Sequence, residues 1–156
     1  MDSNSEIYIK RAKNEINLSK IILKVSGDDN LQKDVFEMPK DTYYSAVISH
    51  AYYSIFYMTK AYLLTKGVKI SPPEEHRKAY EEFKKLVDQG LVDVELLKIY
   101  QQLMLQADTL LEIFQTEKSK RGKFTYRKLP QANVEPAKES IKNAEEFFKH
   151  VNLLCS

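Results

Sequence analysis

Apolar residues recur at helical spacing in five segments of the chain, which glycines and prolines separate from one another. In the segment 92–119 the steps alternate between four and three residues, as in the seam of a helical bundle. This seam consists of Leu96, Tyr100, Leu103, Ala107, Leu110 and Phe114. We therefore predict an all-α protein without strands. The predicted helices cover residues 5–26, 42–66, 74–88, 92–119 and 135–153.

The second predicted helix, residues 42–66, differs from the others because apolar residues occupy most of its circumference. A helix that is hydrophobic nearly all round lies at the centre of a bundle or contributes to a subunit interface. It is interrupted by small and polar residues, so it predicts a buried helix and not a membrane span. Residues 27–41 precede it and are predicted to form a loop.

Short polar side chains before two of the helices are candidate N-caps. Ser3 or Ser5 is placed to cap the first helix, and Asp41 or Thr42 the second.

In the last helix, apolar residues recur at steps of four and three, which predicts one apolar stripe that faces the core. Its members are Ala137, Ile141, Ala144, Phe148 and Val151.

Composition agrees with a helical bundle and limits the classes of function. A chain of 156 residues with 43% hydrophobic residues forms one domain, which we expect to span 1–156. Four glycines and five prolines are few for a β-fold with many tight turns. The architecture is therefore an antiparallel bundle of about five helices. A net charge of +2 requires any nucleic-acid contact to come from a local basic patch.

The single cysteine and the absence of known motifs exclude several classes of functional site. The single cysteine, Cys155, excludes an intramolecular disulfide and a cysteine metal cluster, and we interpret it as inert near a frayed end. No phosphate-binding glycine loop, zinc motif or nucleophile elbow occurs, so no metal and no cofactor is expected. The polar N-terminus lacks a signal-peptide core. We expect a cytoplasmic protein that does not contact membranes.

The strongest candidate for nucleic-acid binding is the basic–aromatic segment, residues 118–128. Its cations can neutralise phosphates while its two aromatic side chains stack on bases. The alternative is a helix C-terminus whose cations complement the helix dipole, with the aromatic rings in the core. The candidate binding residues are Lys118, Lys120, Arg121, Lys123, Phe124, Tyr126, Arg127 and Lys128.

Two histidines and two tyrosines are further candidates. RNA cleavage without a metal needs a proton acceptor and a cation that stabilises the charge on phosphorus. His50 or His76 could transfer the proton, and Arg121 could supply the cation. Tyr53 and Tyr57 could line a nucleotide pocket. The alternatives are a buried His50 bonded to a neighbouring helix, a His76 at an ordinary solvated helix start, and tyrosines that pack in the core or a dimer.

The second helix resembles the signature helix of the HEPN domain (higher eukaryotes and prokaryotes nucleotide-binding), in its small stand-alone prokaryotic branch. The resemblance rests on residues 51–53 (Ala-Tyr-Tyr), Phe56 and residues 61–64 (Ala-Tyr-Leu-Leu). It continues with His76 and with the frame 121–126, and covers about 42–153. It implies a helical bundle, commonly a homodimer, that binds RNA or nucleotides. Many such proteins are toxin-like ribonucleases, and others bind nucleic acid or nucleotides without cleaving. Many act beside a minimal nucleotidyltransferase partner.

The chain also departs from the HEPN pattern. His50 stands where the family usually has arginine, Tyr57 where it has histidine, and Thr125 where it has an acidic residue. Nuclease members carry an arginine followed four to six residues later by a histidine, and none of the four arginines here meets that spacing. The sequence therefore favours binding of RNA or a nucleotide and leaves ribonuclease activity open. The alternative function is a catalytically silent module for dimerisation or protein interaction.

Overall fold

The computed structural model describes residues 2–120 and 133–156, and the side chains of 2–108 and 133–156. Its elements are α1 (Ser3–Ser26), the short π-helical turn η1 (Leu31–Val35), α2 (Tyr44–Thr65), α3 (Glu75–Asp88), α4 (Val94–Lys120) and α5 (Val134–Leu154). No strand occurs in these ranges. The five predicted helices are confirmed, whereas the predicted loop 27–41 contains the unpredicted turn η1.

A side chain caps the start of α1 but not that of α2, and neither N-cap residue is the predicted one. The carboxylate of Asp2 accepts the backbone N–H of Ser5 at 2.8 Å and so caps α1. At α2 the N-cap residue is Tyr43, without a side-chain cap bond. After α2, Gly67 has a φ of 76°, which a residue without Cβ adopts readily. The predicted caps are wrong at both helices: Ser3 or Ser5, and Asp41 or Thr42.

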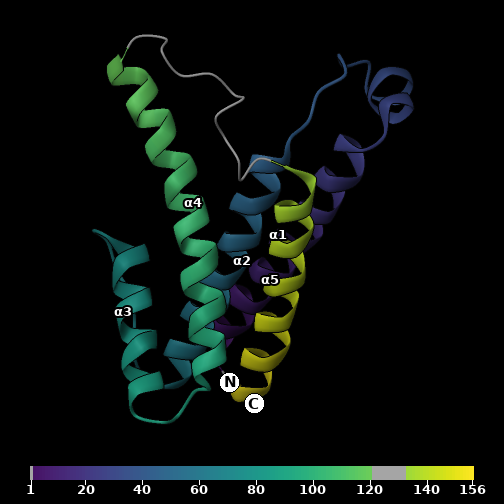
Figure 1. Cartoon of the computed structure of the whole chain (residues 1–156). Helices are drawn as coiled ribbons and strands as arrows, with labels where there is room; N and C mark the ends of the chain where they lie inside the picture. The colour runs from purple at the N-terminus through teal and green to yellow at the C-terminus, as the bar shows by residue number, and fades with distance from the viewer. Residues whose placement is uncertain (1, 121–132) are drawn as a thin grey trace.

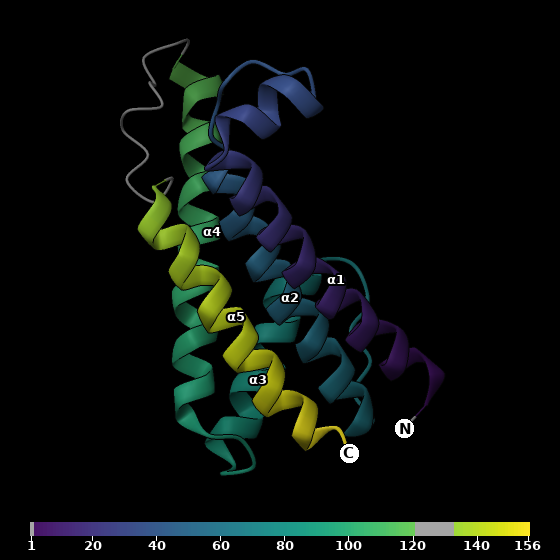
Figure 2. The same cartoon turned by 90° about the vertical axis from the view of Figure 1, so that its right-hand side faces the viewer.

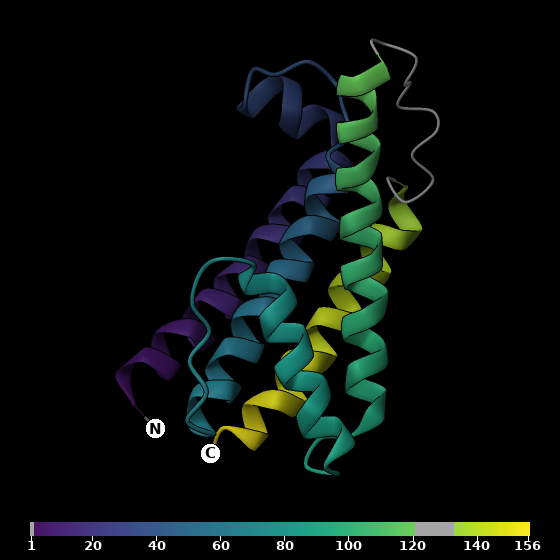
Figure 3. The same ribbon diagram turned by 90° about the vertical axis from the view of Figure 1, so that its left-hand side faces the viewer.

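Helix α2 lies at the centre of the bundle and contacts α1, α3, α4 and α5, as its apolar circumference predicts (Figure 1). Each of the pairs α1–α2, α3–α4 and α4–α5 is antiparallel (Figures 1 and 2). Helix α3 instead runs in the same direction as α2, because residues 66–74 turn back along α2 before α3 begins (Figure 3). This return places the start of α3 beside the middle of α2.

The core is built from α2 and from aromatic side chains of the helices around it. Phe83 of α3, Tyr100 of α4 and Phe147 of α5 are each 0% exposed. Their ring centroids lie 5.5 to 5.8 Å apart. We call these three residues the core aromatic cluster. Phe148, predicted on the inward stripe of the last helix, is only partly buried, and its neighbour Phe147 takes the core position. The fully buried residues of α2 include Val47, Ile48, Ala51, Ile55, Met58, Ala61 and Leu63.

Cys155 is part of this core and does not lie at a frayed end. The residue follows α5, is 6% exposed and packs with the buried residues of the main core. Burial raises the pKa of its thiol to about 11, since the charged thiolate is poorly solvated there. The expected position at a frayed end is therefore wrong.

Candidate functional site

Side chains of α2 and α3 that the sequence singled out meet on one surface. His50 and Tyr53 are three residues apart on α2, so they occupy the same side of the helix. Their rings are 5.6 Å apart in an edge-on arrangement. The ring of His76, from the first turn of α3, lies 6.3 Å from that of Tyr53. Tyr53 is 39% exposed. We call these three residues the histidine–tyrosine surface.

His76 is held in place by two aromatic side chains of α2. Its ring stacks on that of Phe56, with centroids 3.9 Å apart and an angle of 18° between the planes. The hydroxyl of Tyr52 lies 2.9 Å from Nδ1. Burial raises the pKa of Tyr52 above its usual value, so the hydroxyl keeps its proton and can donate it to an unprotonated Nδ1. The position of His76 is thus fixed by packing and by a hydrogen bond.

The environment of His76 lowers the pKa of its imidazole. Burial has the largest effect, because it disfavours the charged form, and the ammonium of Lys60 acts in the same direction. The carboxylates of Glu75 and Asp108 oppose this shift. Because the net change is downward, the imidazole is neutral at pH 7. A neutral imidazole can accept a proton or donate one hydrogen bond to a ligand.

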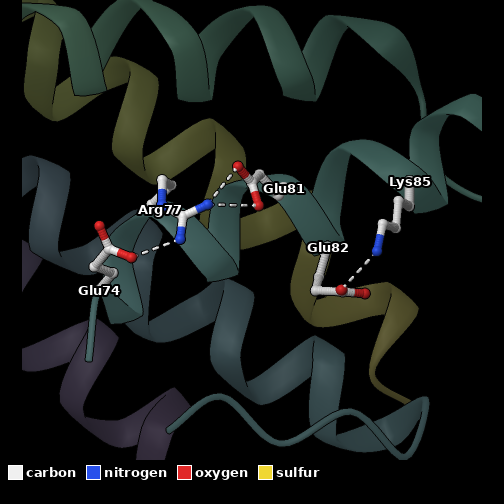
Figure 4. Close-up of polar contacts among 5 residues, drawn as sticks. All are labelled: Glu74, Arg77, Glu81, Glu82 and Lys85. Atoms are coloured by element: carbon white, nitrogen blue, oxygen red, sulfur yellow. Dashed lines mark hydrogen bonds and ion pairs between the residues drawn. The ribbon is translucent and has the colours of Figure 1, made fainter. Parts of the chain in front are cut away.

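The next residue, Arg77, has a different environment on the outer face of α3 (Figure 4). Its guanidinium bonds to Glu74 at 2.6 Å and to Glu81 at 3.0 Å. The charge of Arg77 is therefore paired with the carboxylates of Glu74, the N-cap residue of α3, and of Glu81. The alternative of an ordinary solvated helix start describes Arg77. His76 is also exposed to solvent, although one face of its ring packs against Phe56 of α2.

His50 is bonded to a neighbouring helix, as one of its sequence interpretations proposed. Its Nδ1 lies 2.6 Å from a carboxylate oxygen of Glu15 on α1. The two side chains are 28% and 20% exposed, so the pair is only partly accessible. A carboxylate at one ring nitrogen fixes the orientation of the imidazole and leaves the other nitrogen for a ligand. His50 can therefore bond to Glu15 and still present its other ring nitrogen to a ligand beside Tyr53.

Tyr57 lies in a different cluster. Its hydroxyl accepts a hydrogen bond from Arg11 Nη2 at 2.9 Å, and its ring stacks on Tyr8 at 6.2 Å. Both partners belong to α1. The structure therefore does not bring Tyr57 into contact with the histidine–tyrosine surface, and its proposed role in nucleotide binding stays a prediction.

The basic–aromatic segment falls outside the described part of the site. The backbone of α4 reaches Lys120, but the side chains of Lys118 and Lys120 lie outside the described residues. The predictions for these residues stay predictions. So do those for Arg121, Lys123, Phe124, Tyr126, Arg127 and Lys128, which also lie outside the described residues.

The sequence interpretation missed the residues that hold the two histidines of the histidine–tyrosine surface in position. Glu15 orients His50, and Tyr52 and Phe56 hold His76. Lys60 of α2 lies 3.2 Å from the carboxylate of Glu75, the residue before His76. Among the described side chains no group of three or more histidines, cysteines or carboxylates could hold a metal ion.

Comparison with known proteins identifies the family. No curated protein and no solved structure matches the chain. In the described ranges no helix has the length and apolar character needed to cross a membrane. The family model of the HEPN domain matches residues 30–154, which is most of the chain and includes the whole segment of the resemblance. The chain belongs to the HEPN domain family.

Proposed function

We propose that this HEPN domain binds RNA or a nucleotide on the histidine–tyrosine surface. Membership of the family indicates a function related to nucleotides or RNA. The observation that carries the proposal is the exposed ring of Tyr53, which lies between the imidazoles of His50 and His76.

The chemistry of the surface suits a base and its phosphate. A tyrosine ring with one accessible side stacks on any base, and such stacking contributes about 1–3 kcal/mol per base. The two imidazoles can hydrogen-bond to phosphate or sugar oxygens at the edge of the stacked base. Because His50 and His76 are held by Glu15 and Tyr52, little rotamer freedom is lost when a ligand binds.

The test is binding of a fluorescently labelled single-stranded RNA, followed by anisotropy at low salt. We expect Tyr53→Ala to weaken binding about tenfold, because the stacking platform is lost. Tyr43→Ala is the matched control, since Tyr43 is 38% exposed and contacts neither histidine. Equal affinities of the wild type and Tyr53→Ala would contradict the proposal.

The family resemblance extends the proposal to a homodimer and to a minimal nucleotidyltransferase as protein partner in a toxin–antitoxin pair. If the protein also cleaves RNA, His50 or His76 would transfer the proton and Arg121 would stabilise the charge on phosphorus. Incubation with total cellular RNA in EDTA tests this step. Fragmentation by the wild type but not by Arg121→Ala would establish metal-independent cleavage, and intact RNA would restrict the function to binding.

A second candidate function, protein interaction, is favoured by an apolar groove between the start of α4 and the end of α5. The groove has a volume of about 450 Å³. Leu91 and Leu153 on its lining are 49% and 66% exposed. Exposed apolar residues that line a groove are typical of interaction sites. Unfolding that depends on protein concentration, without any RNA affinity at low salt, would favour this function over RNA binding.

A further inference from the structure

A second concave site is lined by residues from the start of α1, the end of α2 and the linker to α3. Its volume is about 170 Å³. Drug-sized ligands occupy pockets of about 300–1,000 Å³, so this pocket fits a smaller group. We call it the Lys60 pocket. Its lining consists of Asn4, Tyr8, Lys60, Leu64, Lys69 and Ile70.

Lys60 is the buried cation of this pocket. The residue is 8% exposed, and its Nζ lies 3.2 Å from a carboxylate oxygen of Glu75. The same ammonium is 4.7 Å from the ring centre of Tyr8 and 5.3 Å from that of Phe56. A buried ammonium needs such partners because leaving water is costly. The cation is therefore fixed at the wall of the pocket, where a ligand can reach it without ordering a flexible side chain.

The other polar groups of the pocket have no such partners. Among the described residues, no hydrogen bond or ion pair engages the ammonium of Lys69, the amide of Asn4 or the hydroxyl of Tyr8. The charged residues of the lining are Lys60 and Lys69, and the ammonium of Lys60 is paired with the carboxylate of Glu75. The pocket thus combines an excess positive charge with several hydrogen-bond donors.

We propose that the Lys60 pocket binds an oxyanion of the phosphate class, either free phosphate or the phosphate group of a nucleotide. Two ammonium groups, a hydroxyl and an amide can donate to different oxygens of a tetrahedral anion, and bonds of this charge-assisted kind are the strong ones.

The Lys60 pocket is distinct from the histidine–tyrosine surface, but the two sites share one neighbouring residue, Phe56. The ring of Phe56 stacks on His76 and also lies 5.3 Å from the Nζ of Lys60. The charge of Lys60 contributes to the lowered pKa of His76. An anion bound at Lys60 would offset that charge and raise the pKa of His76, which supplies a spectroscopic signal besides binding itself.

The test is calorimetric titration of the full chain with inorganic phosphate in a phosphate-free buffer of low ionic strength. We expect saturable binding, weakened at least tenfold in Lys69→Met, since one of two cations is lost. Lys66→Met is the matched control, because Lys66 is an exposed lysine of the same linker that does not line the pocket. Tyr8→Phe keeps the ring against Lys60, removes only the hydroxyl, and should also weaken binding.

Parallel titrations with AMP and adenosine separate the two sources of phosphate. Binding of inorganic phosphate that depends on Lys69 supports a site for the free anion. Binding of AMP alone, again dependent on Lys69, supports a site for a nucleotide phosphate. The proposal is overturned if neither phosphate nor AMP binds, or if Lys69→Met binds them like the wild type.

The outcome is independent of the proposed RNA-binding function. Tyr53→Ala, which tests that function, should leave phosphate binding unchanged, since Tyr53 does not line the Lys60 pocket. If neither phosphate nor AMP binds in a Lys69-dependent way while RNA binding is lost in Tyr53→Ala, the phosphate pocket is overturned and the RNA-binding proposal stands.

Discussion

The core aromatic cluster and the histidine–tyrosine surface use similar rings at similar distances in different surroundings. Ring centroids are 5.5 to 5.8 Å apart in the core cluster and 5.6 and 6.3 Å apart on the surface. Tyr52 connects the two, with its ring 6.5 Å from Tyr100 and 5.6 Å from His76. The core rings are 0% exposed, whereas Tyr53 is 39% exposed.

This difference teaches that ring spacing does not separate a packing cluster from a binding surface. In the core, the rings are surrounded mainly by other buried side chains, so removing one leaves a cavity. On the surface, Tyr53 is 39% exposed, and its ring neighbours are the imidazoles of His50 and His76 together with Tyr52. The two regions should therefore respond to substitution in different measurements, stability for the first and ligand binding for the second.

The largest expected effect is the loss of stability in Phe83→Ala. Deleting a buried phenylalanine costs about 3–5 kcal/mol, because apolar contacts are lost and a cavity remains. Tyr53→Ala should lower the free energy of unfolding by less than about 1 kcal/mol, as expected of an exposed side chain. Urea denaturation of both variants, with Tyr43→Ala as an exposed control, measures the contrast. Equal losses for Phe83→Ala and Tyr53→Ala would remove the distinction between the regions.

The core could be predicted from the sequence because it depends on local periodicity. The seam of the fourth helix places Tyr100 and Leu103 inward, and both are 0% exposed. The central place of α2 follows from its apolar circumference. In α5 the predicted core residue was Phe148, but the buried residue is its neighbour Phe147. Both are apolar, and periodicity alone does not decide between adjacent rings.

The arrangement of the candidate site could not be predicted because its contacts join distant positions. Glu15 and His50 are 35 residues apart, and Tyr52 and His76 are 24 apart. The second contact depends on the linker that returns along α2, and no local pattern encodes that path. The sequence could single out the histidines by residue type, but not the carboxylate or hydroxyl that holds each one.

A smaller effect is expected at Cys155, the titrating group within the core. With a pKa raised to about 11 from a usual 9.0, its thiolate fraction at pH 8 is about a hundredfold below that of a free thiol. We expect reaction with a disulfide reagent at pH 8 to be slower by at least that factor in the folded protein than in urea. Comparable rates in the two conditions would show that the end of α5 is open to solvent and not part of the core.

The smallest expected effect is the pH dependence contributed by His76, which lies where the two regions meet. Its pKa is below the usual 6.5 in the folded protein, so the unfolded chain takes up the proton first as the pH falls. The contribution of His76 to stability is therefore complete above pH 6.5 and is lost progressively below it.

Urea denaturation at pH 7.5 and 5.5 tests this sign, with His76→Gln as the control for all other titrating groups. The free energy of unfolding should fall more in the wild type than in the variant. Proton NMR of the folded protein should place the midpoint of His76 below that measured in urea. A midpoint above the unfolded value would mean that Glu75 and Asp108 outweigh burial. His76 would then be a charged member of the histidine–tyrosine surface and not a neutral one.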